Sequence, residues 1–529
     1  AQSPALLRGG VRPAAPWLTA DELHAAAPDD VMVISRPGIW FNGKGFTYNK
    51  RHHIFRVDLN GKSPSQVTKG SFDVGEFAVS HDGLRLAYLA VTDDLKPYIS
   101  DLVVLDLRNK RSRKLTRSNM EIEALAWSPD DNSIAFAGDD LPSGFASHVR
   151  IWVARLRTGR VWSVDETDMN KSNGLNSDMR TKAHGTHKVL WATEGIYHVQ
   201  ADGGSVGLYR LKPDSRPAAI VVGPRSVEGF DVSSGRVAFV AMDSSHLEEL
   251  YLLAGREKRL TSFNAETLKL LDIRPSSPFR FKASDGQQIE GWVILPSSKG
   301  KVPAVLYVHG GPKTAFGQAY MHEFQTFAGA GYAVIYMNPR GSDGYSEKFA
   351  DIRGAYGSRD FQDLMEGLDY VLARQRRIDG SRLAIAGGSY GGYMTNWAIG
   401  HTTRFRAAVA DRSIANWVSM WGVSDIGPHF TNDQMMADPW DGDNRLVAES
   451  PLTFAKEVMT PLLLIHSTED YRCPIPEGIQ FFTALKQLGK KAELVVFPGE
   501  NHDLSRTGKP KHRLSRLKHY IRWFDAHLK

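Results

Sequence analysis

Residues whose side chains could together catalyse acyl transfer are spread over the C-terminal half of this sequence. Ser389 lies in Gly387-Gly-Ser-Tyr-Gly391, a G-x-S-x-G segment that follows the apolar run Leu383–Ala386. In a strand-to-helix turn of this kind the serine hydroxyl projects from the end of the sheet, and the glycines leave room for the tight bend. We expect a helix from about Tyr393, whose N-terminus would favour the negative charge that develops during acyl transfer. The alternative is a glycine-rich turn with a bystander serine.

A serine nucleophile needs a general base and a group that orients this base. Enzymes with this turn place the three residues in the order serine, acid, histidine, with the last two in loops after later strands. Asp470 follows the apolar run Leu462–Ile465, and His502 follows Glu493–Phe497. The sequence therefore predicts a catalytic triad of Ser389, Asp470 and His502.

Other acidic and histidine residues compete for these roles. Glu469 and Asp503 flank the predicted pair, so each is an alternative one residue away. His466 lies inside an apolar strand, where a core histidine is expected. Four further aspartates precede the required strand and are interpreted as loop or turn residues: Asp425, Asp438, Asp441 and Asp443.

Two backbone N–H groups are expected to hold the oxyanion of the tetrahedral intermediate. One is that of Tyr390, directly after the nucleophile. The other comes from the segment His309-Gly-Gly-Pro312, which follows the apolar strand Ala304–Val308. Because proline has no N–H, we predict Gly311 as the second donor and Gly310 as the alternative.

The elements that must position these residues are short apolar strands that alternate with amphipathic helices from about residue 273 to the C-terminus. Further strands are expected at Ala333–Met337 and Ala407–Ala410, and a hairpin joins Phe279–Lys282 to Ile289–Leu295. Helices are expected over residues 359–377 and 477–488 and at the C-terminus, because apolar residues recur there every three or four positions. This alternation is typical of a mostly parallel sheet that is covered on both faces.

Residues 38–272 show a different pattern, short strands with a period of two separated by turn residues. The segment Phe77–Tyr88, with Ser-His-Asp at its turn, is echoed by Leu125–Phe136, with Ser-Pro-Asp, and more weakly by Phe230–Phe239. A repeat of about 45 residues is typical of one four-stranded propeller blade. We predict about five blades, with residues 1–37 as a leader or an incomplete propeller segment; an irregular β-sandwich is the alternative.

The composition is that of a globular protein. Of 529 residues, 42% are hydrophobic and 23% are charged, which argues against disorder and fibrous repeats. The net charge of +6 is small, and the basic residues are scattered apart from Lys509–Arg516. We interpret that segment as a solvated helix face rather than a nucleic-acid patch, so we expect no nucleic-acid partner. No apolar run approaches the roughly 18 residues of a membrane span, and one cysteine, Cys473, excludes an internal disulfide and a cysteine-based zinc site. We expect a cytoplasmic protein, or a periplasmic one if a leader was removed before Ala1.

With these residues in place, the C-terminal half resembles the peptidase domain of the prolyl oligopeptidase family, most of all its acylaminoacyl-peptidase branch. The matching segments are residues 309–312, 338–345, 387–393, 468–470 and 501–502. The resemblance implies an α/β-hydrolase domain over residues 273–529, capped by the propeller. It also implies a serine peptidase that cleaves short peptides, with access limited by size, and with no metal or organic cofactor. Relatives of this branch often form homo-oligomers.

The propeller departs from the family pattern. Relatives usually carry seven or eight blades, whereas this sequence shows about five. We therefore expect either a chain shortened at its N-terminus or an open, unusual propeller. Either would affect the size filter and leave the catalytic residues intact.

The sequence contains few indications of the substrate. Trp417 and Trp421 could line an apolar acyl pocket, with core packing as the alternative. Arg340 and Arg412 could bind a peptide carboxylate, with structural ion pairs as the alternative. Acylaminoacyl-, dipeptidyl- and carboxypeptidase-like release therefore stay open. A carboxylesterase with the same triad and a catalytically inert propeller scaffold are the other functions considered.

Overall fold

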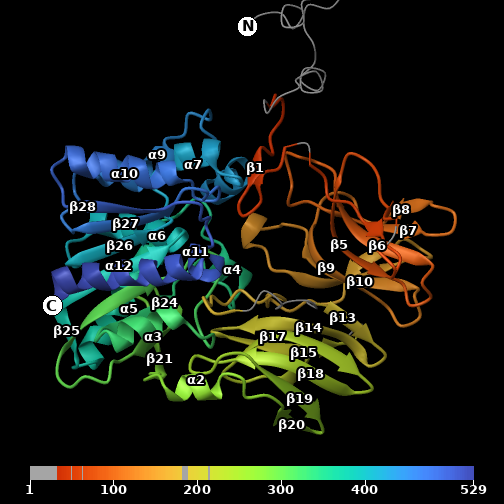
Figure 1. Ribbon diagram of the computed structural model, residues 1–529, viewed down its shortest axis with the longest axis horizontal. Helices are drawn as coiled ribbons and strands as arrows, with labels where there is room; N and C mark the ends of the chain where they lie inside the picture. Colours follow the sequence, from red (N-terminus) through yellow and green to blue (C-terminus); the bar gives the residue numbers. More distant parts are fainter. Residues whose placement is uncertain (1–31, 49, 62, 181–188, 213–214) are drawn as a thin grey trace, which may run out of the picture.

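The computed structural model describes residues 32–48, 50–61, 63–180, 189–212 and 215–529. It has two parts that lie side by side, an all-β part on the right of Figure 1 and an α/β part on the left. The predicted N-terminal leader falls almost entirely outside the described residues. None of the helices in the described ranges has the length and apolar character to cross a bilayer.

The all-β part is built from four-stranded antiparallel blades, as the sequence repeat predicts. β5–β8 and β9–β12 form two separate sheets, and two further blades, β13–β16 and β17–β20, are joined by one parallel pair between Val206 and Ser226. Two short hairpins precede the complete blades. The strands are β1 (Trp40–Phe41), β2 (Gly45–Phe46), β3 (Phe55–Arg56), β4 (Ser65–Gln66), β5 (Asp73–Val79), β6 (Arg85–Val91), β7 (Asp101–Asp106), β8 (Ser112–Lys114), β9 (Glu121–Trp127), β10 (Ser133–Asp139), β11 (Arg150–Arg155), β12 (Val161–Ser163), β13 (Val189–Ala192), β14 (Gly195–Asp202), β15 (Ser205–Leu211), β16 (Ala218–Val221), β17 (Ser226–Ser233), β18 (Arg236–Met242), β19 (Glu249–Ala254) and β20 (Arg256–Arg259).

The register of the strands explains the sequence echoes. In each echo the first and last residues are direct cross-strand partners: Phe77 with Tyr88, Leu125 with Phe136, and Phe230 with Phe239. Each echo is therefore one hairpin between the first two strands of a blade. The described residues hold four complete blades and the earlier hairpin β3–β4, and the count of about five blades stays a prediction.

The α/β part contains one eight-stranded sheet in the order β21-β22-β24-β23-β25-β26-β27-β28. β21–β22 and β22–β24 pair antiparallel, and all other neighbours pair parallel. The strands are β21 (Ser276–Lys282), β22 (Gln288–Ile294), β23 (Val302–Val308), β24 (Ala333–Asn338), β25 (Ile378–Gly388), β26 (Ala407–Asp411), β27 (Leu462–Ser467) and β28 (Ala492–Phe497). The predicted sheet is confirmed, and the predicted boundary near residue 272 falls in the connection between β20 and β21.

Helices cover both faces of this sheet because its strands alternate apolar residues between two cores. Ile335 and Ile385 point into the core under α5, α6 and α10, whereas Val334 and Ala384 point into the core under α3 and α12. The helices are α2 (Ala265–Lys269), α3 (His322–Gly329), α4 (Glu347–Ala350), α5 (Arg359–Arg374), α6 (Tyr390–His401), α7 (Trp417–Val423), α8 (Asn432–Met435), α9 (Arg445–Ala448), α10 (Ile475–Gln487), α11 (Leu504–Thr507) and α12 (Pro510–Leu528).

The parallel register brings the predicted site residues to one edge of the sheet. Val308 pairs with Gly387, so the loop after β23 lies beside the turn after β25. Ser467 pairs with Phe497, so the loops after β27 and β28 are neighbours as well. One boundary differs from the prediction: α6 begins at Tyr390, directly after Ser389, and not at Tyr393. The glycines of the turn let the helix start immediately at its bend.

Candidate active site

Ser389 occupies a strained turn between β25 and α6. Its φ of 63° and ψ of −124° are rare for a residue with a side chain, and such conformations are found at functional turns of this kind. The neighbouring glycines are required by space: a Cβ at Gly391 would overlap the carbonyl oxygen of Val308, and one at Gly387 would lie 2.6 Å from the same atom. The turn therefore holds the hydroxyl of Ser389 at the end of the sheet.

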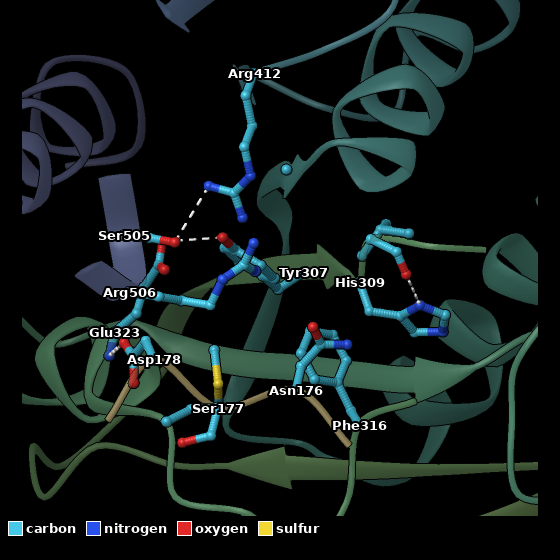
Figure 2. Close-up of a pocket in the computed structure, with 14 residues that line it drawn as sticks. Asn176, Ser177, Asp178, Tyr307, His309, Phe316, Glu323, Arg412, Ser505 and Arg506 are labelled. Carbon is cyan, nitrogen blue, oxygen red and sulfur yellow. Dashed lines mark hydrogen bonds between the residues drawn. The ribbon is translucent and has the colours of Figure 1, made fainter. Parts of the chain in front are cut away.

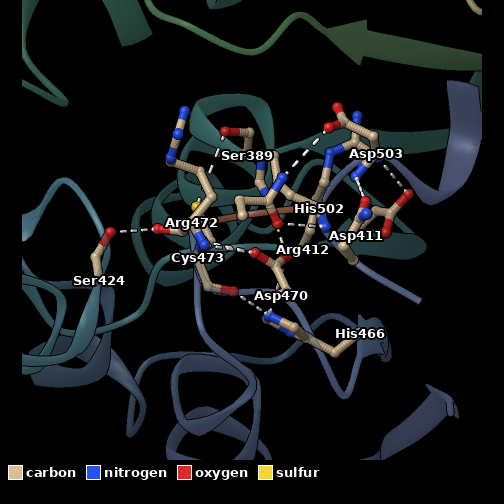
Figure 3. Close-up of polar contacts among 12 residues, drawn as sticks. Ser389, Asp411, Arg412, Ser424, His466, Asp470, Arg472, Cys473, His502 and Asp503 are labelled. Carbon is tan, nitrogen blue, oxygen red and sulfur yellow. Dashed lines mark hydrogen bonds and ion pairs between the residues drawn. The ribbon is translucent and has the colours of Figure 1, made fainter. Parts of the chain in front are cut away.

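His502 and Asp470 form a buried hydrogen-bonded pair (Figure 3). His502 Nδ1 lies 2.8 Å from Asp470 Oδ2, and Asp470 Oδ1 accepts from the backbone N–H groups of Arg472 at 3.0 Å and Cys473 at 2.9 Å. Because the carboxylate accepts at Nδ1, the proton of a neutral imidazole is held there. His502 Nε2 is then left with the lone pair that a general base needs.

The nucleophile and the histidine are brought to the same site without a hydrogen bond between them. Among the described residues, the contact recorded for Ser389 Oγ is with Cys473 Sγ at 3.9 Å, not with His502. Catalytic hydrogen bonds are often long in substrate-free enzymes and tighten when substrate binds. The arrangement therefore fits a resting active site, and Cys473 packs next to the nucleophile.

The electrostatics of the pair favour a neutral imidazole. Burial lowers the pKa of His502 well below its ordinary value, and the nearby guanidinium groups of Arg412 and Arg506 lower it further. Burial raises the pKa of Asp470, and the hydrogen bond from the Cys473 N–H opposes this shift. At neutral pH His502 can therefore accept a proton.

The two predicted oxyanion donors lie on opposite sides of Ser389 in the chain. Tyr390 is the first residue of α6, so its N–H is one of the unpaired donors at a helix N-terminus. In the other loop, Gly310 packs against the nucleophile, because a Cβ there would lie 3.3 Å from Ser389 Cβ. Gly311 has a φ of 124°, a conformation that favours glycine. Its role as the second donor stays a prediction.

A buried hydrogen bond fixes the residue that follows the nucleophile. The Tyr390 hydroxyl donates to Asp360 Oδ2 at 2.6 Å, and the backbone N–H of Gly357 donates to the same oxygen at 3.1 Å. Burial raises the pKa of Asp360 to about 6, and the Tyr390 hydroxyl counteracts the rise by stabilising the carboxylate. This contact anchors the start of α6.

Removal of the Tyr390 hydroxyl, in Tyr390→Phe, is expected to destabilise the protein more at pH 8 than at pH 5. In the folded protein the pKa of Asp360 lies above its ordinary value of 3.8, so this carboxyl binds its proton more tightly in the folded state than in the unfolded state. Protonation of Asp360 therefore favours folding at low pH, and this contribution to the free energy of unfolding is lost as the pH rises through about 6. Phenylalanine removes a donor to the carboxylate, raises that pKa further, and costs about 1–3 kcal/mol where Asp360 is ionised. Melting temperatures at the two pH values measure the difference.

The matched control is Tyr356→Phe. Tyr356 is also buried, and its hydroxyl donates at 2.5 Å to the neutral side chain of Gln434. Its loss is expected to cost about the same at both pH values. Equal destabilisation of Tyr390→Phe at pH 5 and pH 8 would contradict the assigned role of Asp360.

The two predicted tryptophans differ in position. Trp417 is fully buried, and its ring packs against those of Tyr356 and Tyr393 at 5.6 and 5.3 Å. It therefore belongs to the core, which was the alternative interpretation. Trp421 is half-buried, and its indole N–H donates to Asp438 at 2.9 Å. A substrate role for Trp421 stays a prediction.

Both predicted arginines are engaged in ion pairs. Arg340 donates from Nε to Asp363 at 2.9 Å and also pairs with Asp285. Arg412 lies 3.3 Å from Asp411 and 3.2 Å from Ser505 Oγ. These are the structural ion pairs named as the alternative to carboxylate binding.

Arg412 also lines a small, partly open pocket that Gly388 and Gly310 border (Figure 2). The cavity measures about 30 Å³, which is room for about two water molecules and too little for a peptide side chain.

Within the described ranges, no three His, Cys, Asp or Glu side chains are grouped so that they could hold a metal ion.

Sequence reasoning missed two residues next to the pair. Asp425, interpreted as a loop residue, has a fully buried side chain that is ion-paired with Arg472. Asn42, in the hairpin β1–β2, accepts a hydrogen bond from the backbone N–H of His502. No local pattern in the sequence indicates either contact, because the partners are 47 and 460 residues apart.

Two family models match separate parts of the chain. Residues 318–529 match the prolyl oligopeptidase family. Residues 29–246 match the N-terminal β-propeller domain of acylaminoacyl-peptidase. The two matches fall on the α/β part and the all-β part respectively.

Similar proteins cover most of the chain. An uncharacterized peptidase, YuxL, of Bacillus subtilis strain 168 is 36% identical over 525 residues, covering 96% of this chain and 80% of the relative. A dipeptidyl-peptidase 5 of Porphyromonas gingivalis is 26% identical over 486 residues, covering 86% and 67%. The structure of an acylaminoacyl peptidase from Pyrococcus horikoshii superposes with a TM-score of 0.83 at 29% identity, covering 95% and 78%.

Proposed function

Since the chain belongs to the prolyl oligopeptidase family of serine peptidases, we propose that it hydrolyses short peptides through an acyl-enzyme formed on Ser389. The observation that carries the proposal is the buried His502–Asp470 pair beside the strained turn of Ser389. Such a pair activates a serine hydroxyl on several unrelated folds.

In the proposed reaction, Ser389 Oγ forms a bond to the carbonyl carbon of the scissile peptide while His502 Nε2 takes the hydroxyl proton. Asp470 keeps the ring oriented and stabilises the imidazolium. The carbonyl oxygen becomes an oxyanion, which the N–H groups of Tyr390 and Gly311 stabilise. The intermediate then expels the amine, which receives the proton from His502. Water hydrolyses the ester by the same steps.

Release from the amino-terminal side of the substrate, of the acylaminoacyl or dipeptidyl type, is the mode we favour. A carboxypeptidase-like mode would use a free cation to bind the substrate carboxylate. Arg340, one candidate, already contacts two carboxylates, and Arg412 is buried against Asp411. Relatives named dipeptidyl-peptidase 5 and acylamino-acid-releasing enzyme agree with this preference.

The proposal is tested with a fluorophosphonate probe and a set of matched peptides. We expect the probe to label Ser389, and peptides with a blocked or free amino terminus to be cleaved near that end. Peptides that differ only in their carboxyl terminus are expected to react alike. An ester of the same acyl group separates a peptidase from a carboxylesterase, which would cleave only the ester. Absence of labelling would indicate an inert scaffold.

We expect kcat/KM to fall only at acidic pH. The midpoint of this fall is expected to lie below about 6.5, the ordinary pKa of a histidine side chain. The sign follows from the lowered pKa of His502: the imidazole stays neutral, and can accept the serine proton, to a lower pH than a free histidine. Initial rates from pH 4 to pH 9 measure the midpoint. A midpoint above 6.5 would contradict the assigned environment of His502.

Three further expectations stay proposals. One is a boundary between the two domains near residue 272. The others are a homo-oligomeric assembly and a cytoplasmic location.

A further inference from the structure

The hairpin of β1 and β2, residues 40–46, contacts the α/β part of the chain. Trp40 pairs with Phe46 across the hairpin, and Phe41 pairs with Gly45. In Figure 1, β1 lies at the boundary between the two parts. This hairpin reaches the loops that carry His502 and Asp470.

Asn42, in this turn, hydrogen-bonds to the His502 loop through both ends of its side-chain amide. Its Oδ1 accepts from the backbone N–H of His502 at 3.0 Å, and its Nδ2 donates to Asp503 Oδ2 at 3.3 Å. The backbone N–H of Asn42 donates to Asp425 Oδ2 at 2.9 Å. Two bonds thus fix Asn42 relative to the His502 loop, and the third connects it to Asp425.

Aromatic side chains of the same hairpin contact the loop that carries Asp470. The Trp40 ring stacks on that of Tyr471, with centroids 5.2 Å apart and 17° between the ring planes. Phe46 meets the same ring edge-on at 6.3 Å. Both are favourable arrangements for aromatic pairs. Tyr471 directly follows Asp470, so the hairpin contacts the loops of both residues.

An ion pair completes the connection. Asp425, whose side chain is fully buried, accepts from Arg472 Nε at 2.8 Å and Nη2 at 3.1 Å. The backbone N–H of Arg472 donates in turn to Asp470 Oδ1 at 3.0 Å. A path of direct bonds therefore runs from Asn42 through Asp425 and Arg472 to Asp470.

We infer that Asn42 is a positioning residue, which holds His502 and Asp470 in place from the hairpin β1–β2. The inference rests on the proposed function, because it takes His502 as the general base. Catalytic side chains act efficiently only when supporting contacts lock their geometry, and a misplacement of about 1 Å can cost about 100-fold in rate. The active site of the α/β part is therefore complete only with the hairpin docked.

The test is the rate at which a fluorophosphonate labels Ser389, which needs the general base and no knowledge of the substrate. For Asn42→Ala we expect labelling about 10- to 100-fold slower at pH 8, in protein that is folded at the temperature of the assay. Asn132→Ala is the matched control, since the Asn132 side chain bonds to Asp130 within the turn between β9 and β10. Its labelling rate is expected to equal that of the wild type.

A second variant, Asn42→Asp, keeps an oxygen that can accept from the His502 N–H and adds a negative charge nearby. The charged groups that already act on the imidazole are Asp470, Asp503, Arg412, Arg472 and Arg506. The added charge is expected to move the acidic midpoint of the labelling rate to higher pH. A hairpin that is not docked against the His502 loop would leave this midpoint unchanged.

The outcomes separate the inference from the proposed function. A wild-type protein that is not labelled overturns the proposed function, and the inference with it. A labelled wild type with equal rates for Asn42→Ala overturns the inference alone. If Asn42→Ala fails to fold, Asn42→Asp decides: a shifted midpoint supports the inference and an unshifted one overturns it.

Discussion

Ser389→Ala is expected to abolish peptide hydrolysis, with a loss in kcat on the order of a million-fold, while the protein stays folded. In the proposed reaction the Ser389 hydroxyl oxygen forms the covalent bond to the substrate. Without it, the oxyanion donors alone support only a small residual rate of hydrolysis. Stability should change little, because the contact recorded for Ser389 Oγ is a long one to Cys473 Sγ. Single-turnover kinetics and a melting curve measure both effects.

The matched control is Ser381→Ala, at the other end of the same strand, β25. The Ser381 hydroxyl donates to Asp379 at an exposed position. This variant is expected to keep full activity and to react with the fluorophosphonate. Retention of even a tenth of the activity by Ser389→Ala, in protein free of wild-type enzyme, would show that another nucleophile acts.

Much of the fold could be predicted because the relevant patterns are local. The echoed segments Phe77–Tyr88 and Leu125–Phe136 are single hairpins, so their repetition is visible along the sequence. Strands such as Leu462–Ser467 are buried on both faces and appear as continuous apolar runs. The positions of Asp470 and His502 follow from such strands, because loops at the carboxyl ends of parallel strands meet at one edge of the sheet.

Contacts between distant parts of the chain could not be predicted. An asparagine such as Asn42, beside a glycine, has the sequence of an ordinary turn, and its bond to the His502 loop depends on how the two parts of the chain dock. Whether Trp417 is in the core or in a pocket depends on the rings that surround it. Arg340 acquires its partner Asp285 from a hairpin 55 residues away, so its ion pair has no local signal.

Asp470→Asn is expected to lower kcat on the order of 10⁴-fold without changing the fold. The two backbone N–H donors, of Arg472 and Cys473, both point at Oδ1 of residue 470 and require an oxygen there. The amide of asparagine must therefore present its NH₂ group to His502 Nδ1. That nitrogen then has to accept, the proton moves to Nε2, and the imidazole can no longer take the proton of Ser389.

Glu469→Gln is the control that tests this orientation argument, because it makes the same chemical change at the exposed neighbouring position. It is expected to leave kcat and KM within about twofold, as surface changes usually do. The substitution Asp470→Asn acts through the general base, His502. We therefore expect its rate of fluorophosphonate labelling to fall in parallel with kcat, while KM changes little. A large rise in KM at unchanged kcat would instead place residue 470 in substrate binding and contradict its assignment to the triad.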